Sequence, residues 1–405
     1  MSSLMTKSDF PKILVATSFP PDVPGGSSWL LYQLLRDVPP GQVAWWSMIG
    51  DAPAHSRERV GAYKSGHLPS RLMPHRRFTQ TKSFLLEQFW VPSASRGLQA
   101  FIKEQQPDLL WLLAYSWATP VLHRAVRGLG IPWHLTVHDL SDSVGLVRSL
   151  GAGRARRFQG MVDDLYTGAV SRDVYMRETG DEMERTTGCK ADIVVRCGAE
   201  PEEIAYVRTK PFDPPVDKIR IGYPGTIIAD DTFARFIAAL KLIGPSLPLP
   251  LEVNLFGNHS YRNRPWFDDS IIVEHGYLPE DELDRRYRKC NWGLAIMELD
   301  DSNPRYSRFT FPCKFTRALA FGLPLIVIGH PECTLIQFSR AYQLGPVITS
   351  PEPQAIAEQL LPALSQPLDS PQLRQEILRC VETEFNADIN RKRLHELFRR
   401  GARAS

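Results

Sequence analysis

The sequence predicts an α/β protein made of two Rossmann-like domains that face each other across a cleft. The chain has 405 residues, which is enough for two domains that each bury a core. Each half contains a series of apolar strands, loops and amphipathic helices. Between the two series, TKPFDPPVD (209–217) carries three prolines without periodicity and is typical of a linker. We therefore expect domains at residues 1–210 and 211–385.

The first strand of the N-terminal half is KILVATS (12–18), and its exit loop contains three prolines followed by Gly25 and Gly26. A strand, a glycine-containing loop and a helix together open a Rossmann-like unit, where such a loop can approach a phosphate. Paired glycines also serve simple turns, so both interpretations of Gly25-Gly26 stay open.

Two further apolar strands are predicted at PDLLWLLAYSW (107–117) and IPWHLTVHDL (131–140). The second strand ends in His138 and Asp139. In a doubly wound sheet, ligands bind outside the carboxyl ends of the strands, so His138 is a candidate binding residue. The alternative is that His138 and Asp139 only cap the following helix.

The C-terminal half begins with the strand KIRIGYPGT (218–226) and centres on FTFPCKFTRALAFGLPLIVI (309–328). In that stretch we expect a helix that is capped by Thr310, has Pro312 in its first turn and stops at Gly322 before a buried strand. The first turn carries Lys314, and a loop that leads into a helix N-terminus is a favourable place for an anion. The alternative is an ordinary αβ unit with a solvated lysine.

Composition excludes several classes of protein. The net charge of +3 is too small to indicate nucleic-acid binding, and the six cysteines form no CxxC or zinc-like spacing. We expect reduced thiols, no metal site and no disulfides. No segment approaches the roughly 20 apolar residues that span a bilayer, and the N-terminus lacks an apolar signal segment. These features favour a cytoplasmic protein.

A basic stretch at residues 55–85 carries seven Arg and Lys residues against one acid and leads into SFLLEQFW (83–90). A second basic cluster follows, which consists of Arg148, Arg154, Arg156 and Arg157. Such a pattern is expected for attachment to an anionic membrane surface or to an acidic acceptor. The alternative is a solvated charged face.

Several of these motifs together resemble the GT-B glycosyltransferases, especially the large retaining family called GT4. The pattern FxxPxKFxxALAxGLPLIV (309–327) resembles their donor-site segment. The strand that begins at Pro107-Asp108 resembles their "P-D" strand, and the strand that ends at His138-Asp139 resembles their "T-x-H-D" strand. The resemblance covers nearly the whole chain as scattered motifs. It implies an N-terminal acceptor domain, a C-terminal donor domain and a last helix (386–405) that returns to the first domain.

The resemblance also implies a reaction. The chain would move a sugar from a nucleotide-diphosphate sugar, a UDP-sugar first of all, to a glycan, lipid-linked or small-molecule acceptor. The reaction would be retaining and would need no metal or other cofactor. Lys314 would stabilise the diphosphate, together with the backbone N–H groups of the glycine loop and of the helix start. His138 would contact the donor sugar, and Tyr277-Leu278 would read the base. The donor-binding positions implied are Gly25, Gly26, Gly225, Thr226, Tyr277, Leu278, Thr310, Phe311, Pro312 and Arg317.

The sequence departs from the family at three places. Gly225 is followed by Thr226 and apolar residues, where the family commonly has an arginine and a lysine. The two glutamates of the donor segment are replaced by Phe309 and Arg317, and Cys197 stands where the family has an asparagine. Two hypotheses therefore stay open: a divergent active enzyme, or a degenerate GT-B scaffold that binds a nucleotide, a glycan or a protein partner.

Overall fold

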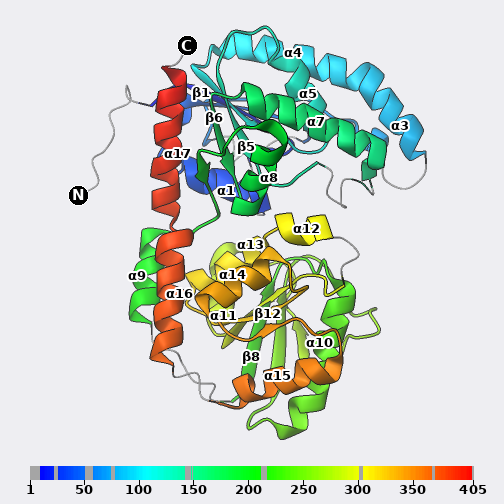
Figure 1. Cartoon of the computed structure of the whole chain (residues 1–405), viewed down its shortest axis with the longest axis vertical. Coiled ribbons are helices and arrows are strands. Elements are labelled where there is room, and N and C mark those ends of the chain that lie inside the picture. Colours follow the sequence, from blue (N-terminus) through cyan, green and yellow to red (C-terminus); the bar gives the residue numbers. More distant parts are fainter. Residues whose placement is uncertain are drawn as a thin grey trace. The chain divides into compact units, whose positions relative to one another are not determined.

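The computed structural model describes residues 10–21, 26–50, 58–73, 78–141, 147, 149–210, 217–300, 304–366 and 370–403 (Figure 1). Gly25, most of the predicted linker, and Arg57, Arg76, Arg77 and Arg148 of the basic clusters lie outside these ranges.

The chain forms two compact units. The first contains Met1–Arg196 together with Ile389–Ser405, and the second contains Cys197–Asp388. The change of unit comes before residue 210 because helix α9 (Pro201–Thr209) packs against helices α13 and α16 of the second unit.

The first unit is built on a parallel seven-stranded sheet with the order β3-β2-β1-β4-β5-β6-β7. Ile13 of β1 lies in register with Val43 of β2 and Leu109 of β4. The strands are β1 (Ile13–Thr17), β2 (Val43–Ser47), β3 (Ala62–Ser65), β4 (Leu109–Leu113), β5 (Trp133–Val137), β6 (Ser171–Val174) and β7 (Ile193–Val194). Strands β1 and β4 are apolar and buried along their whole length, as is expected where helices cover both faces of a parallel sheet.

The helices of the first unit are α1 (Gly26–Leu35), α3 (Thr79–Leu85), α4 (Val91–Gln105), α5 (Ala118–Ala125), α7 (Ala152–Gly168), α8 (Arg177–Thr187) and most of α17 (Ala387–Ala402). Helices α4, α5, α7 and α8 pack in succession as one layer. Helix α17, red in Figure 1, covers β4 and β5, where the ring of Phe398 lies 5.0 Å from that of Trp111 and 5.2 Å from that of His134. A single π-type turn, η3 (Leu86–Trp90), joins α3 to α4, and short 3₁₀ turns lie at η1 (Pro40–Gln42) and η2 (Ser70–Leu72).

The second unit has a parallel six-stranded sheet with the order β10-β9-β8-β11-β12-β13. Its strands are β8 (Ile219–Pro224), β9 (Leu251–Phe256), β10 (Ile272–Glu274), β11 (Trp292–Ile296), β12 (Leu325–Ile328) and β13 (Val347–Ile348). The helices, apart from α9, are α10 (Asp230–Ile243), α11 (Glu280–Tyr287), α12 (Pro304–Phe309), α13 (Cys313–Ala320), α14 (Thr334–Tyr342), α15 (Pro353–Ser365) and α16 (Pro371–Glu384), with the 3₁₀ turn η4 (Gly244–Ser246).

Glycines in the central strands bring helices α11 and α13 close to this sheet. A Cβ atom at Gly222 of β8 would lie 2.3 Å from the ring of Tyr287, and one at Gly293 of β11 would lie 2.4 Å from Cβ of Ala318. Only glycine fits such approaches. They fix α13 directly against β11, so that its N-terminal turn lies beside the carboxyl end of β8.

The predicted α/β class with two Rossmann-like domains is confirmed. No helix in the described ranges is long and apolar enough to cross a membrane. No disulfide joins any of the six cysteines, all of which lie in the described ranges, and Sγ of Cys197 lies 3.9 Å from Sγ of Cys313.

Candidate functional site

Each sheet contains one point at which the strand order changes direction. In the first unit this point lies between β1 and β4, and in the second it lies between β8 and β11. The loops that leave the carboxyl ends of such strands turn to opposite faces of the sheet, and the crevice between them is where α/β proteins bind ligands. Two candidate residues, His138 and Lys314, lie at these edges.

In the second unit, Lys314 joins the helix that follows β11 to the end of β8 and the turn after it. It is the second residue of α13, and its Nζ donates to Oη of Tyr223 (2.6 Å) and to the carbonyl oxygen of Thr226 (2.8 Å). The ammonium also lies 4.1 Å from the centre of the Tyr223 ring. Thr226 follows Gly225, whose φ of +93° gives the turn after β8 a backbone conformation that favours glycine. The structure thus brings Lys314, Gly225 and Thr226 together.

The charge on Lys314 has little compensation. Burial lowers its pKa from 10.5 to about 8, against a smaller opposing effect of Cys313, so the ammonium form still dominates at pH 7. Both of its acceptors are neutral, and within the described ranges no carboxylate pairs with it. A half-buried cation without a counter-charge is costly, and an anion that binds beside it removes part of that cost.

Glycines also hold together the loops that follow β8, β9 and β10. The N–H of Gly225 donates to the carbonyl of Phe256 (2.6 Å), and the N–H of Gly257 donates to the carbonyl of Gly276 (3.0 Å). A Cβ at Gly257 would lie 3.3 Å from the carbonyl oxygen of Gly225. Tyr277 follows Gly276 with 66% of its surface exposed, and Leu278 is half-buried. This edge therefore offers an exposed aromatic ring close to backbone polar groups.

The start of α13 differs from the sequence prediction. The helix begins at Cys313, and Pro312 occupies the N-cap position in an extended conformation, so the expectation that Pro312 lies in the first turn is wrong. Thr310 lies further upstream and does not cap the helix, since the N-cap makes no side-chain hydrogen bond. The reason is packing: Phe311 is buried against Phe315, which keeps the chain extended up to the helix.

Phe311 belongs to a cluster of four phenylalanines with ring separations of 4.8–5.9 Å, formed with Phe315, Phe338 and Phe385. Its side chain is therefore part of the core. Phe311 anchors the start of α13, and through it the position of Lys314.

Arg317 lies one turn after Lys314 but is directed toward α11. Its guanidinium pairs with Glu280 (2.7 Å) and Asp284, and lies 5.1 Å from the ring of Phe321. Because two carboxylates compensate its charge, Arg317 joins α13 to α11 and does not add a second cation beside Lys314.

In the first unit, His138 lines a cavity of about 180 Å³ at the carboxyl ends of β1, β4 and β5. The other lining residues are Ser18, Phe19, Leu113, Ala114, Tyr115 and Asp139. The imidazole meets the ring of Tyr175 edge to face at 5.6 Å. Burial lowers the pKa of His138 to about 4, although the Asp173 carboxylate acts in the opposite direction. At neutral pH the ring is uncharged, so one ring nitrogen can donate a hydrogen bond to a sugar hydroxyl and the other can accept one.

A buried polar network lies behind this cavity, and the sequence analysis did not identify it. His134 contacts the Asp173 carboxylate through Nε2 (2.6 Å) and Ser171 Oγ through Nδ1 (2.7 Å). Thr136 donates to Asp173 and accepts from Trp111 Nε1 (2.8 Å). Only part of the signal was present in the sequence: polar residues at 134 and 136 alternate with apolar ones along β5, whereas the charged Arg172 lies between Ser171 and Asp173 in β6. The register places His134 beside Ser171 and Thr136 beside Asp173, so both pairs point to the same face.

Among the glycine positions of the first unit, Gly26 opens α1 as expected, while Gly25 lies outside the described residues. The described residues contain no group of three or more His, Cys, Asp or Glu side chains that could hold a metal ion.

No family model matches the sequence, and no curated protein matches it either. Solved structures do match over almost the whole chain. Sucrose-phosphate synthase from Thermosynechococcus elongatus is similar with a TM-score of 0.64 and 15% identity, covering 97% of this chain and 100% of the other. A glycosyltransferase from Rickettsia africae gives 0.65 and 11%, covering 98% and 100%.

A trehalose-6-phosphate structure from E. coli, bound with UDP-2-fluoro glucose, gives a TM-score of 0.61 and 12% identity, covering 96% of this chain and 99% of the other. Identities this low show the fold alone. The chain has the GT-B fold of these glycosyltransferases.

Proposed function

We propose that this protein is a glycosyltransferase that moves a sugar from a nucleotide-diphosphate sugar to an acceptor. The acceptor would be a glycan, a lipid-linked saccharide or a small molecule. One observation carries the proposal. Lys314 lies where the strand order of the second sheet changes direction, which is where α/β proteins bind ligands, and its ammonium donates only to uncharged acceptors. A diphosphate is an anion of the kind that such a site favours.

The second unit would bind the nucleotide diphosphate. When the anomeric C–O bond breaks, negative charge grows on the leaving diphosphate, and a cation already in place stabilises the transition state more than the ground state. Lys314 would exchange its bond to the Thr226 carbonyl for a phosphate oxygen. Positive charge from Lys314 and from the start of α13 is the basis for proposing a metal-independent reaction. Tyr277 would stack on the base.

The first unit would bind sugar hydroxyls in the cavity lined by His138. The imidazole is neutral at pH 7, so we give it the role of positioning a hydroxyl through a hydrogen bond rather than of attacking carbon. We propose retention because the sequence resembles a retaining family. With no attack by His138, the acceptor oxygen would bond to the anomeric carbon from the face that the diphosphate leaves, and its proton would pass to the departing phosphate. A UDP-sugar is the first donor to test, because the similar E. coli structure holds UDP-2-fluoro glucose.

The alternative function is a scaffold that binds a nucleotide without turnover. Three observations favour it. Ile227, Ile228 and Ala229 follow Thr226 without a cation, and Arg317 is engaged by α11. The first turn of α10 also carries Asp230 and Asp231, which would repel a phosphate placed at that terminus.

One experiment separates the two functions. The protein is screened by thermal shift against UDP, GDP, ADP, CMP and dTDP and their sugar conjugates, and the conjugate that binds is then incubated to measure release of the free nucleotide. A rise in Tm together with nucleotide release supports a transferase. A rise in Tm without release supports the scaffold, and no rise with any nucleotide contradicts both.

We also propose that the first unit makes peripheral contact with an anionic membrane surface, on the cytoplasmic side. Three aromatic side chains near α3 are largely exposed: Phe78 (76%), Phe84 (55%) and Phe89 (69%). Lys82 lies in the last turn of the same helix. Exposed aromatic rings beside basic residues are typical of helices that lie in a membrane interface.

A further inference from the structure

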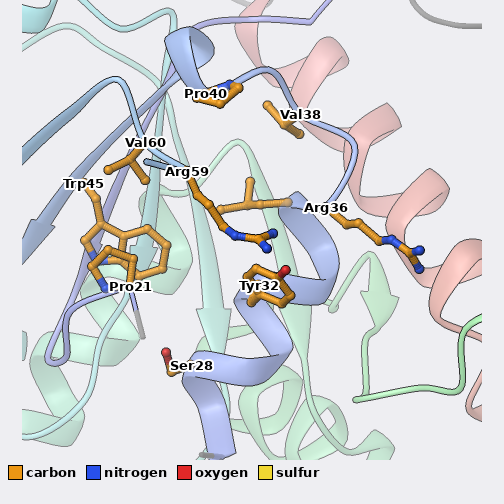
Figure 2. A pocket seen from close by; sticks show the side chains of 10 residues that line it. Pro21, Ser28, Tyr32, Arg36, Val38, Pro40, Trp45, Arg59 and Val60 are labelled. Carbon is orange, nitrogen blue, oxygen red and sulfur yellow. The ribbon is translucent and has the colours of Figure 1, made fainter. Parts of the chain in front are cut away.

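The first unit contains a second cavity that the proposed function does not use. It lies between helix α1 and strand β2, and its walls are formed largely by Tyr32, Leu35, Val38, Trp45 and Val60 (Figure 2). Arg59 extends over this space from the segment before β3.

The walls of this cavity are largely apolar, and the one polar atom of the Trp45 side chain is already bonded. Trp45 is buried, and its Nε1 donates to Oγ1 of Thr17 (3.0 Å) and to the carbonyl of Phe19 (3.2 Å). The indole therefore presents only hydrocarbon to the cavity. Tyr32 is held by stacking on Trp29, with ring centres 5.5 Å apart. Because Arg59 also lies over the Tyr32 ring, the indole of Trp45 is the aromatic wall on which a flat apolar group would pack.

The size of the cavity limits its occupant. Its volume of about 140 Å³ is close to the roughly 150 Å³ of an engineered apolar cavity that binds benzene. One six-membered ring fits such a volume, whereas a nucleotide or a disaccharide does not.

The charge at the mouth is positive. The Arg59 guanidinium lies 4.1 Å from the centre of the Tyr32 ring, and in the described part of the chain no carboxylate pairs with it. No acidic residue lines the cavity. Figure 2 shows the Arg36 guanidinium directed away, so Arg59 is the cation that faces an occupant. A guanidinium presents a fork of donors that matches a carboxylate.

We propose that this cavity is a binding site for a small aromatic carboxylate, with the ring against Trp45 and the carboxylate on Arg59, which stays over Tyr32. All residues of this site belong to the first unit, so it shares none with the nucleotide site proposed in the second. The segment that leads from β1 separates it from the cavity of His138, because Phe19 lines that cavity and Pro21 lines this one.

The test uses benzoate as the probe, with benzamide as its uncharged isostere and inorganic phosphate as the charge without a ring. Titration calorimetry on the full chain is expected to show benzoate binding at millimolar concentrations, with benzamide roughly tenfold weaker or worse and no binding of phosphate. Equal affinity for benzoate and benzamide, binding of phosphate as tight as that of benzoate, or no binding of benzoate would each overturn the proposal.

Two variants locate the site. Arg59→Gln removes the charge at an exposed position and is expected to weaken benzoate roughly tenfold or more. Val60→Trp fills the cavity and is expected to abolish binding. Arg96→Gln, at an exposed arginine of α4, is the matched control and should leave affinity unchanged. If Arg59→Gln binds benzoate as the parent does, the cavity does not hold the carboxylate.

Discussion

Replacing Lys314 by methionine separates the two roles that a half-buried lysine can have. A structural lysine stabilises the fold through its hydrogen bonds, whereas a ligand-binding lysine is maintained at the expense of stability. Methionine has a similar length and removes only the ammonium. Tyr223 Oη still donates to the Thr226 carbonyl (3.2 Å), so one of the hydrogen bonds that hold the loop after β8 remains.

The structure gives the size of two opposing effects on stability: the cost of burying the Lys314 ammonium and the gain from its hydrogen bonds. Lowering the pKa of Lys314 from 10.5 to about 8 corresponds to roughly 3 kcal/mol of destabilisation at neutral pH. Its two hydrogen bonds contribute about 1 kcal/mol each in the other direction. We therefore expect Lys314→Met to be as stable as the parent, or more stable by about 1 kcal/mol.

The pH dependence of stability has a definite sign. Between pH 8 and 10.5 the unfolded chain binds more protons at Lys314 than the folded protein does, so the stability contributed by this group rises with pH in that window. The methionine variant lacks this rise. Urea unfolding of parent and variant at the two ends of the window measures the difference.

Loss of function should be large by comparison. Removing a charge that strengthens its contact in the transition state costs about 2–4 kcal/mol, so kcat/KM should fall by roughly 10²–10³. Calorimetry should show weaker binding of the bare nucleoside diphosphate as well. Lys289→Met is the matched control, because Lys289 is exposed and lies just before the amino end of β11, away from the crevice. A Lys314 variant that is clearly less stable than the parent and binds the diphosphate equally well would refute the reasoning.

Three further predictions concern the first unit. His138→Ala should lower kcat while nucleoside diphosphate affinity stays the same, because the histidine lines the cavity proposed for the sugar; a drop in diphosphate affinity would contradict this. Burial also lowers the pKa of His395 to about 4, so the folded state loses stability as pH falls from 6.5 through 4. His395→Gln, which can still donate to the Leu34 carbonyl, should reduce that loss in urea titrations at pH 5 and 7, and an unchanged difference would argue against it. The double change Phe84→Ser and Phe89→Ser should weaken co-sedimentation with anionic vesicles at low salt, and equal binding would remove the proposed membrane contact.

The strands that could be predicted from the sequence are those whose residues are all apolar, because both of their faces are buried. Strands β1, β4 and β12 are buried on both faces and read as apolar segments. Strand β3 is only half-buried and lies within the basic stretch, so it was not predicted. Strand β6 was missed because Ser171 and Asp173 are polar, and only their contacts with β5 explain why they are buried.

The site was predictable to the extent that it depends on local chain geometry. The helix that bears Lys314 was expected from its own residues, whereas Gly225 and Thr226 were expected at the site only from the family resemblance. The contact between Lys314 and Thr226 depends on how α13 lies against β11 and β8, which Gly222 and Gly293 permit. Which way a side chain points from a helix is decided by neighbouring elements, and this is why the pairing of Arg317 with α11 could not be predicted from its position in the sequence.

The most direct test of the central claim is a crystal structure of the protein with the nucleoside diphosphate that gives the largest thermal shift. The account predicts a phosphate oxygen about 3 Å from Nζ of Lys314, beside Gly225 and the start of α13. It also predicts that the lysine has given up its bond to the Thr226 carbonyl. A diphosphate bound elsewhere, with Lys314 still bonded to both Tyr223 and Thr226, would contradict the account.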